Sequence, residues 1–137
     1  MIVYLDTSTV LRVLLRQRGT LRAWNRWSEA YSSEILRVES RRVVDRLRLE
    51  SILDDEGVAL AHEELARIER SIALIRLSTH VLERAAQPMP TVVKTLDAIH
   101  LATALLFRES RRDEVEFATH DVRQSTAARA LGFRCVG

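Results

Sequence analysis

Short apolar runs alternate along the chain with longer segments in which apolar residues recur at helical intervals. The clearest runs span residues 2–5, 72–77, 115–119 and 133–136, and a weaker one spans 31–33. The first run is almost continuously apolar, which is typical of a strand buried on both faces. These runs predict four or five short strands.

The segments between the strands predict helices. They cover about 10–15, 21–27, 35–50, 58–70, 80–86, 95–107 and 122–131. Thr7 or Ser8 is expected to cap the first helix, and Gly132 to follow the last one as its C′ residue. Alternation of strands and helices predicts an α/β fold with a mainly parallel sheet.

Composition narrows the class of protein. The 137 residues suit a single domain spanning 1–137, and 47% hydrophobic with 29% charged residues is typical of a globular chain. No apolar run approaches the roughly 18 residues of a membrane span. The one cysteine, Cys135, excludes a disulfide framework, and no signal peptide is recognisable, so we expect a cytoplasmic location.

Arginine dominates the basic residues, because Lys94 is the only lysine among 21 Lys and Arg. Arginine binds phosphate bidentately, which would suit a nucleic-acid partner. Codon bias in a GC-rich genome would give the same ratio, and the net charge of +2 is too small to decide.

Two acidic residues directly follow predicted strands. Asp6 ends the run 2–5, and Asp121 comes just after the run 115–119. Ligands of parallel sheets gather beyond the carboxyl ends of the strands, so both carboxylates stand where functional groups are expected. The alternative for each is a simple cap of the helix that follows.

Glu39 interrupts an apolar stripe on the helix predicted over 35–50. The other members of this stripe, four residues apart, are Ile35, Val43 and Leu47. A carboxylate facing the core is costly unless it is paired or bound to a cation. A salt bridge to Arg42 or Arg46 is the alternative to a functional role.

Asp97 lies in the first turn of a helix that is apolar nearly all round. The helix dipole favours a negative charge there, so dipole compensation is the alternative to a functional role. His100 follows one turn later on the same side. We interpret His100 as a buried residue that supports the acids, in preference to a metal ligand.

Together these positions suggest one anionic site. Four carboxylates in one place would repel and raise each other's pKa, and a divalent cation removes that repulsion. Mg²⁺ prefers a few carboxylates together with water and substrate phosphate. Such a site activates water for attack on a phosphodiester, so the sequence favours metal-dependent phosphodiester hydrolysis.

Four segments carry a family resemblance. Residues 3–8, the helical Glu39, residues 95–104 and residues 118–121 resemble the PIN-domain family, most closely the VapC-type toxins of type II toxin–antitoxin modules. The resemblance implies a three-layer α/β/α fold with strand order 3-2-1-4-5. It also implies a Mg²⁺- or Mn²⁺-dependent endoribonuclease that cuts tRNA or rRNA, forms homodimers and is silenced by an antitoxin protein.

The resemblance also assigns roles to individual residues. The acidic quartet would be Asp6, Glu39, Asp97 and Asp121. Asp6 and Asp97 would bind the metal directly, and the other two would act through water. Ser8 and Thr119 would orient the acids. Lys94 stands where many relatives have arginine, and we expect it to contact substrate phosphate as a point charge.

Two other functions are considered. A phosphatase of the haloacid-dehalogenase type also begins with a strand ending in Asp, but it needs a second Asp where this chain has Ser8. A non-catalytic PIN-fold binding module is disfavoured because all four acids are present.

Trp24 and Trp27 could stack on RNA bases, although packing in the core or an interface is the preferred interpretation.

Overall fold

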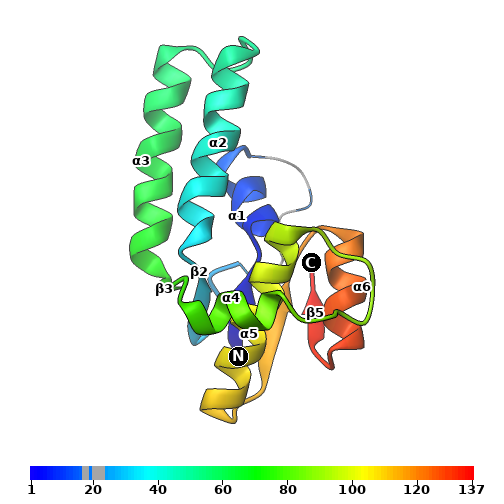
Figure 1. Ribbon diagram of the computed structural model, residues 1–137. Helices are drawn as coiled ribbons and strands as arrows, with labels where there is room; N and C mark the ends of the chain where they lie inside the picture. The colour runs from blue at the N-terminus through cyan, green and yellow to red at the C-terminus, as the bar shows by residue number, and fades with distance from the viewer. Residues whose placement is uncertain (17–18, 20–23) are drawn as a thin grey trace.

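A five-stranded parallel sheet forms the centre of the protein, which we describe from a computed structural model for residues 1–16, 19 and 24–137 (Figure 1). The strand order is β3-β2-β1-β4-β5, and every pair is parallel. The strands are β1 (Ile2–Leu5), β2 (Glu29–Ser33), β3 (Ala73–Ile75), β4 (Val115–Ala118) and β5 (Arg134–Val136).

Helices cover both faces of the sheet. They are α1 (Thr7–Leu14), α2 (Ile35–Leu49), α3 (Asp55–Ser71), α4 (Thr79–Ala85), α5 (Thr95–Arg111) and α6 (Val122–Ala130). Side chains of α1, α2 and α3 form one hydrophobic core with the sheet, and those of α5 and α6 form a second. The fold is therefore the three-layer α/β/α sandwich with the strand order that the resemblance implied.

The central strand β1 separates the two cores. Val3 and Leu5 face the core shared with α1–α3, while Tyr4 faces the core under α5 and α6. All three side chains are fully buried. Side chains of a strand alternate between faces, so a continuously apolar strand must be covered on both sides, as the sequence pattern indicated.

Several predicted elements are confirmed. The weak run at 31–33 belongs to β2, and the predicted run 72–77 is the short strand β3. Gly132 has a positive φ of 86° directly after α6, and its amide donates to the carbonyl of Arg129 at 2.9 Å. That left-handed position is the one expected of a C′ glycine.

Other predictions were wrong. Trp24 lies in a turn and Trp27 in irregular chain, so no helix joins them, and Leu21 lies outside the described residues. Their rings meet edge to face at 5.1 Å and pack against the core, which agrees with the packing interpretation. The N-cap position of α1 is Asp6 and not Thr7 or Ser8.

The topology brings the segments after β1 and β4 to one edge of the sheet. Asp6 follows β1, and Asp121 follows β4 by three residues, because parallel neighbours end on the same side. The hairpin of α2 and α3 extends to one side of this edge (Figure 1), and α2 contributes Glu39 from its second turn. None of the helices in the described part of the chain is long and apolar enough to cross a membrane.

Candidate active site

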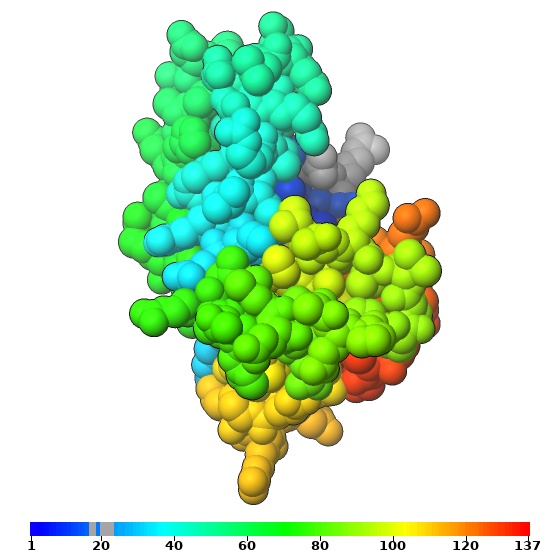
Figure 2. Space-filling view, viewed as in Figure 1, coloured from blue at the N-terminus to red at the C-terminus, as the bar shows by residue number. Residues whose placement is uncertain are grey.

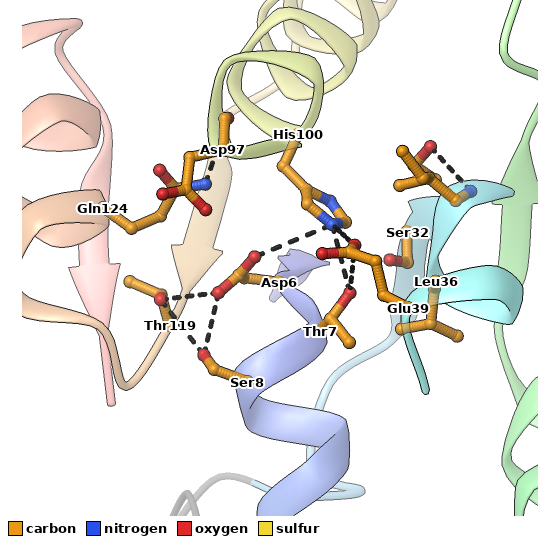
Figure 3. A network of polar contacts seen from close by, with 12 residues as sticks. Asp6, Thr7, Ser8, Ser32, Leu36, Glu39, Asp97, His100, Thr119 and Gln124 are labelled. Carbon is orange, nitrogen blue, oxygen red and sulfur yellow. Dashed lines mark hydrogen bonds and ion pairs between the residues drawn. The ribbon is translucent and has the colours of Figure 1, made fainter. Parts of the chain in front are cut away.

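Asp6 forms the centre of the polar network at this edge (Figure 3). Its Oδ2 accepts hydrogen bonds from Ser8 Oγ at 2.8 Å and from Thr119 Oγ1 at 2.9 Å. The residue is only 5% exposed. Although Asp6 occupies the N-cap position of α1, its side chain makes no capping bond. The carboxylate is therefore turned toward the site and away from the helix that it precedes.

The hydroxyls of Ser8 and Thr119 connect the ends of β1 and β4. They lie 3.2 Å from each other, and the amide of His120 donates to Ser8 Oγ at 3.0 Å. The amide of Asp121 donates to Thr119 Oγ1 at 3.1 Å. The two hydroxyls thus hold Asp6 through donors that are themselves fixed by the backbone after β4.

His100 joins a second part of the network. Its side chain is completely buried, with Nδ1 2.7 Å from Tyr4 Oη and Nε2 2.6 Å from Glu39 Oε1. Thr7 Oγ1 lies 3.1 Å from the same Nε2 and donates to Glu39 Oε1 at 2.8 Å. Nε2 is also 3.8 Å from Asp6 Oδ1. The imidazole therefore lies between two acids and a buried phenol.

Burial and charge compete in setting the ionisation of this pair. Burial lowers the pKa of His100, but the hydrogen bond to Glu39 and the negative charge of Asp6 leave it raised overall. Burial raises the pKa of Glu39, yet its bond with His100 leaves it lowered overall. Both shifts favour an ion pair between imidazolium and carboxylate.

Glu39 lies near the core, as the sequence predicted, but the predicted apolar stripe is not the buried face of α2. The buried face of α2 consists of Leu36, Ser40 and Val44, one residue along from the predicted stripe. Glu39 stands beside that face with its side chain 19% exposed. The alternative partners are engaged elsewhere, since Arg42 pairs with Asp45 at 2.8 Å and Arg46 lies 3.9 Å from Glu50.

Asp97 reaches the site from the first turn of α5. Its pKa is raised, first by burial and then by the charges of Asp6, Asp121 and Glu39, with His100 acting in the opposite sense. Figure 3 shows the Asp97 carboxylate beside that of Asp6, and Asp97 lines the same cavity as Asp121. The acids that were separated by up to 115 positions in the chain are therefore brought together by the fold.

Asp121 is the outermost of the four acids and performs the capping role that was its alternative interpretation. Its Oδ1 accepts from the amides of Arg123 at 2.8 Å and Gln124 at 3.1 Å, at the start of α6. Its charge still acts on Asp97. Asp121, Asp97 and the exposed Lys94 line one cavity of about 410 Å³.

Three residues of the network were missed by sequence reasoning. Thr7 was assigned to a cap, although a hydroxyl next to Asp6 was a usable signal. Tyr4 sits inside an apolar strand and gives no signal of its polar contact. Gln124, fully buried on α6, donates from Nε2 to the carbonyl of Asp97 at 3.2 Å and so fixes α5 against α6.

The donor set fits a hard divalent cation in an open site. The groups that line the site are carboxylates, and burial together with the charges of the other acids raises the pKa of Asp97. Among the described residues, no three His, Cys, Asp or Glu side chains are arranged to hold a metal by themselves. Mg²⁺ commonly uses one or two carboxylates and completes its shell with water and phosphate, so the arrangement suits Mg²⁺ better than a closed structural site.

Fold and site together define a PIN domain. The PIN-domain family model matches residues 3–130, and the chain belongs to this family. It is 32% identical to Ribonuclease VapC46 of Mycobacterium tuberculosis (strain ATCC 25618 / H37Rv) over 98% of this chain and 95% of that protein. It is 29% identical to Ribonuclease VapC47 of M. tuberculosis (strain CDC 1551 / Oshkosh), over 96% and 93%. The resemblance to VapC-type proteins is thereby confirmed.

Solved structures agree on the fold. FitAcB from Neisseria gonorrhoeae superposes with a TM-score of 0.72 at 20% identity, covering 99% of this chain and 97% of that one. A toxin–antitoxin complex from Klebsiella pneumoniae gives a TM-score of 0.62 at 20% identity, covering 90% and 89%. The family assignment replaces the haloacid-dehalogenase alternative.

Proposed function

We propose that this chain is a metal-dependent endoribonuclease and the toxin of a VapBC-type toxin–antitoxin module. The observation that carries the proposal is the arrangement of acids around one region of the sheet edge: His100 Nε2 lies 3.8 Å from Asp6 and 2.6 Å from Glu39, Asp97 is drawn beside Asp6 in Figure 3, and Asp121 lines the same cavity as Asp97. Both curated relatives are named ribonucleases, which supports RNA as the substrate. The substrate bond is an RNA phosphodiester, of tRNA or rRNA.

Asp6 and Asp97 are the residues that would hold Mg²⁺ or Mn²⁺. When bound, that ion activates water and neutralises charge on the phosphate. Ser8 and Thr119 keep the Asp6 carboxylate in one orientation through their two hydrogen bonds. Lys94, at the start of α5, contacts a phosphate of the substrate.

Glu39 and Asp121 act on water. Oε1 of Glu39 is engaged by His100 and Thr7, so we assign its other oxygen, Oε2, to orienting the attacking water. Asp121 is held by the first amides of α6 and faces the site from its rim. In-line attack then breaks the bond to the 3′ oxygen and leaves a 3′-hydroxyl and a 5′-phosphate.

An antitoxin would cover the groove between α1 and the α2–α3 hairpin. This groove has a volume of about 810 Å³ and is lined both by charged residues and by apolar residues that include Leu14, Leu53, Ile52 and Leu60, the last two more than half exposed. Exposed apolar surface of this kind is typical of protein interfaces. The toxin–antitoxin complex among the structural relatives supports such a partner. We also propose a homodimer and a cytoplasmic location.

Cleavage of total RNA by the purified chain tests the proposal. We expect cleavage that stops in EDTA, returns with Mg²⁺ or Mn²⁺, and is lost in Asp6→Asn. Asp113→Asn is the matched control, since Asp113 pairs with Arg111 at the far end of α5. Full cleavage in EDTA would refute the metal-dependent mechanism. Calorimetry that detects no binding of either metal would instead favour the non-catalytic binding module.

A further inference from the structure

Two cavities flank the start of α6, one on each side. The first, of about 410 Å³, lies between α6 and the end of the loop that leads into α5. The second, of about 400 Å³, lies between α6 and α1. Asp121 and Val122 line both cavities. The start of α6 is thus a ridge between two hollows, at the outer edge of the acidic cluster.

Each cavity is lined by at least one acid of the site and by basic residues. Lys94 and Arg123 line the first cavity, beside Asp97. Arg129 and Arg12 line the second, beside Asp121. The side chains of Arg123 and Arg129 are exposed on α6, and no ion pair with a described acid is found for either. Arg123 and Arg129 are therefore the cations of α6 that can meet an anionic ligand.

The first cavity also has an apolar rim. Val92 is 88% exposed and Val122 is 79% exposed, and they contribute to the same cavity from two different elements. In Figure 2 the loop before α5, in yellow-green, and α6, in orange, lie on the same side of the molecule. The apolar side chains can contact the edge or face of a base, and the neighbouring cations can contact a phosphate.

The amides at the start of α6 are not the binding groups. Asp121 already accepts from the amides of Arg123 and Gln124, so a phosphate would meet a carboxylate at the helix end. Recognition of a polyanion must therefore come from the side chains on either side of the ridge.

We infer that a single RNA strand passes over α6 from one of these cavities to the other, with Arg123 binding a phosphate on one side of the scissile bond and Arg129 one on the other. This inference rests on the proposed ribonuclease function and extends it to the path of the substrate. Arg123 and Arg129 are six positions apart, which spans about 9 Å along a helix axis. Six positions also turn the two side chains about 120° apart around the axis, so each reaches toward a different cavity and they can contact separate phosphates of one strand.

Salt-dependent binding provides the test. We would use the full chain carrying Asp97→Asn, so that RNA is not cut, and measure fluorescence anisotropy of a labelled single-stranded RNA of mixed sequence. Each lost phosphate contact lowers the slope of log Kd against log salt by about 0.7 for a single strand. Arg123→Gln and Arg129→Gln should each lower it by this amount, and the double variant by about twice as much.

Arg112→Gln is the matched control. Arg112 is exposed and follows the far end of α5, about 22 Å along the helix axis from Asp97. The slope of log Kd against log salt for Arg112→Gln should equal that of the parent chain. Slopes for Arg123→Gln and Arg129→Gln that equal the control would overturn the path, as would a decrease in only one of them.

The result separates this inference from the proposed function. If the wild-type chain cleaves RNA in Mg²⁺ while both arginine variants keep the parent slope, the ribonuclease stands and the path is wrong. If the wild-type chain neither cleaves nor binds RNA, the proposed function fails and the path fails with it. Thermal melts that match the parent would show that the substitutions leave the fold intact.

Discussion

Replacing His100 by Phe would remove the imidazole that contacts Glu39 while keeping a ring in the buried space. The change deletes the contacts to Tyr4 Oη, Thr7 Oγ1 and Glu39 Oε1, at 2.7, 3.1 and 2.6 Å. Removing one partner of a buried ion pair costs about 3–5 kcal/mol, because the other charge is left without compensation. We therefore expect His100→Phe to lower the free energy of unfolding by about that amount.

The loss of stability in His100→Phe should depend on pH, and the two pKa shifts fix the direction of that dependence. The folded pKa of His100 is raised above its ordinary 6.5, so its contribution is complete below that pH and disappears as pH rises through the folded pKa. The folded pKa of Glu39 is lowered from 4.5, so its contribution is complete above that pH and disappears as pH falls through the folded pKa. The difference in the free energy of unfolding between wild type and His100→Phe should be largest at pH values between these two ordinary pKa values.

Urea unfolding followed by circular dichroism, in EDTA, measures this difference. We expect a larger destabilisation at about pH 5.5 than at about pH 9. Glu39→Gln supplies a double-mutant cycle, in which the coupling between the two residues should be about 0.5–3 kcal/mol. A destabilisation that is below about 1 kcal/mol, or that grows toward high pH, would refute the ion pair.

Three further predictions concern single side chains. Thr119→Val removes a hydrogen bond to Asp6 and should slow RNA cleavage about 10- to 100-fold, while Thr126→Val, on the outer face of α6, should leave the rate unchanged. Asp121→Asn should reduce cleavage yet leave the melting temperature unchanged, because Asn caps a helix as well as Asp; unchanged cleavage would mean that the residue is only a cap. Phe117→Ala should lower the free energy of unfolding in urea by about 3–5 kcal/mol, since the ring is fully buried between two others; a loss below about 1 kcal/mol would contradict this core assignment.

Periodicity predicted most of the fold because each face of the sheet is buried by a separate set of residues. β1 reads as apolar throughout, and α3 shows Ala61, Leu65 and Ile68 on one buried stripe, as expected. Periodicity was less successful at the boundaries. α5 continues to Arg111, past the predicted end near 107, because its last turns are polar and give no apolar signal.

The candidate site was partly predictable. The acids could be found because a carboxylate at a strand end or beside a core is unusual, and the fold brings Asp6 and Asp97 close enough to interact. The contacts of His100 could not be found, because they depend on three-dimensional packing against β1 and α2. Local sequence also gave no reason to join Tyr4, Thr7 and Glu39 through one imidazole.

Single-turnover cleavage of RNA by Asp97→Asn tests the central claim most directly, because this change removes one charge at the start of α5 and little volume. We expect the rate to fall about 100-fold or more, while Asp113→Asn, two residues beyond the other end of α5, cleaves at the wild-type rate. Equal rates for Asp97→Asn and wild type, with both folded, would show that the acidic cluster is not the catalytic centre.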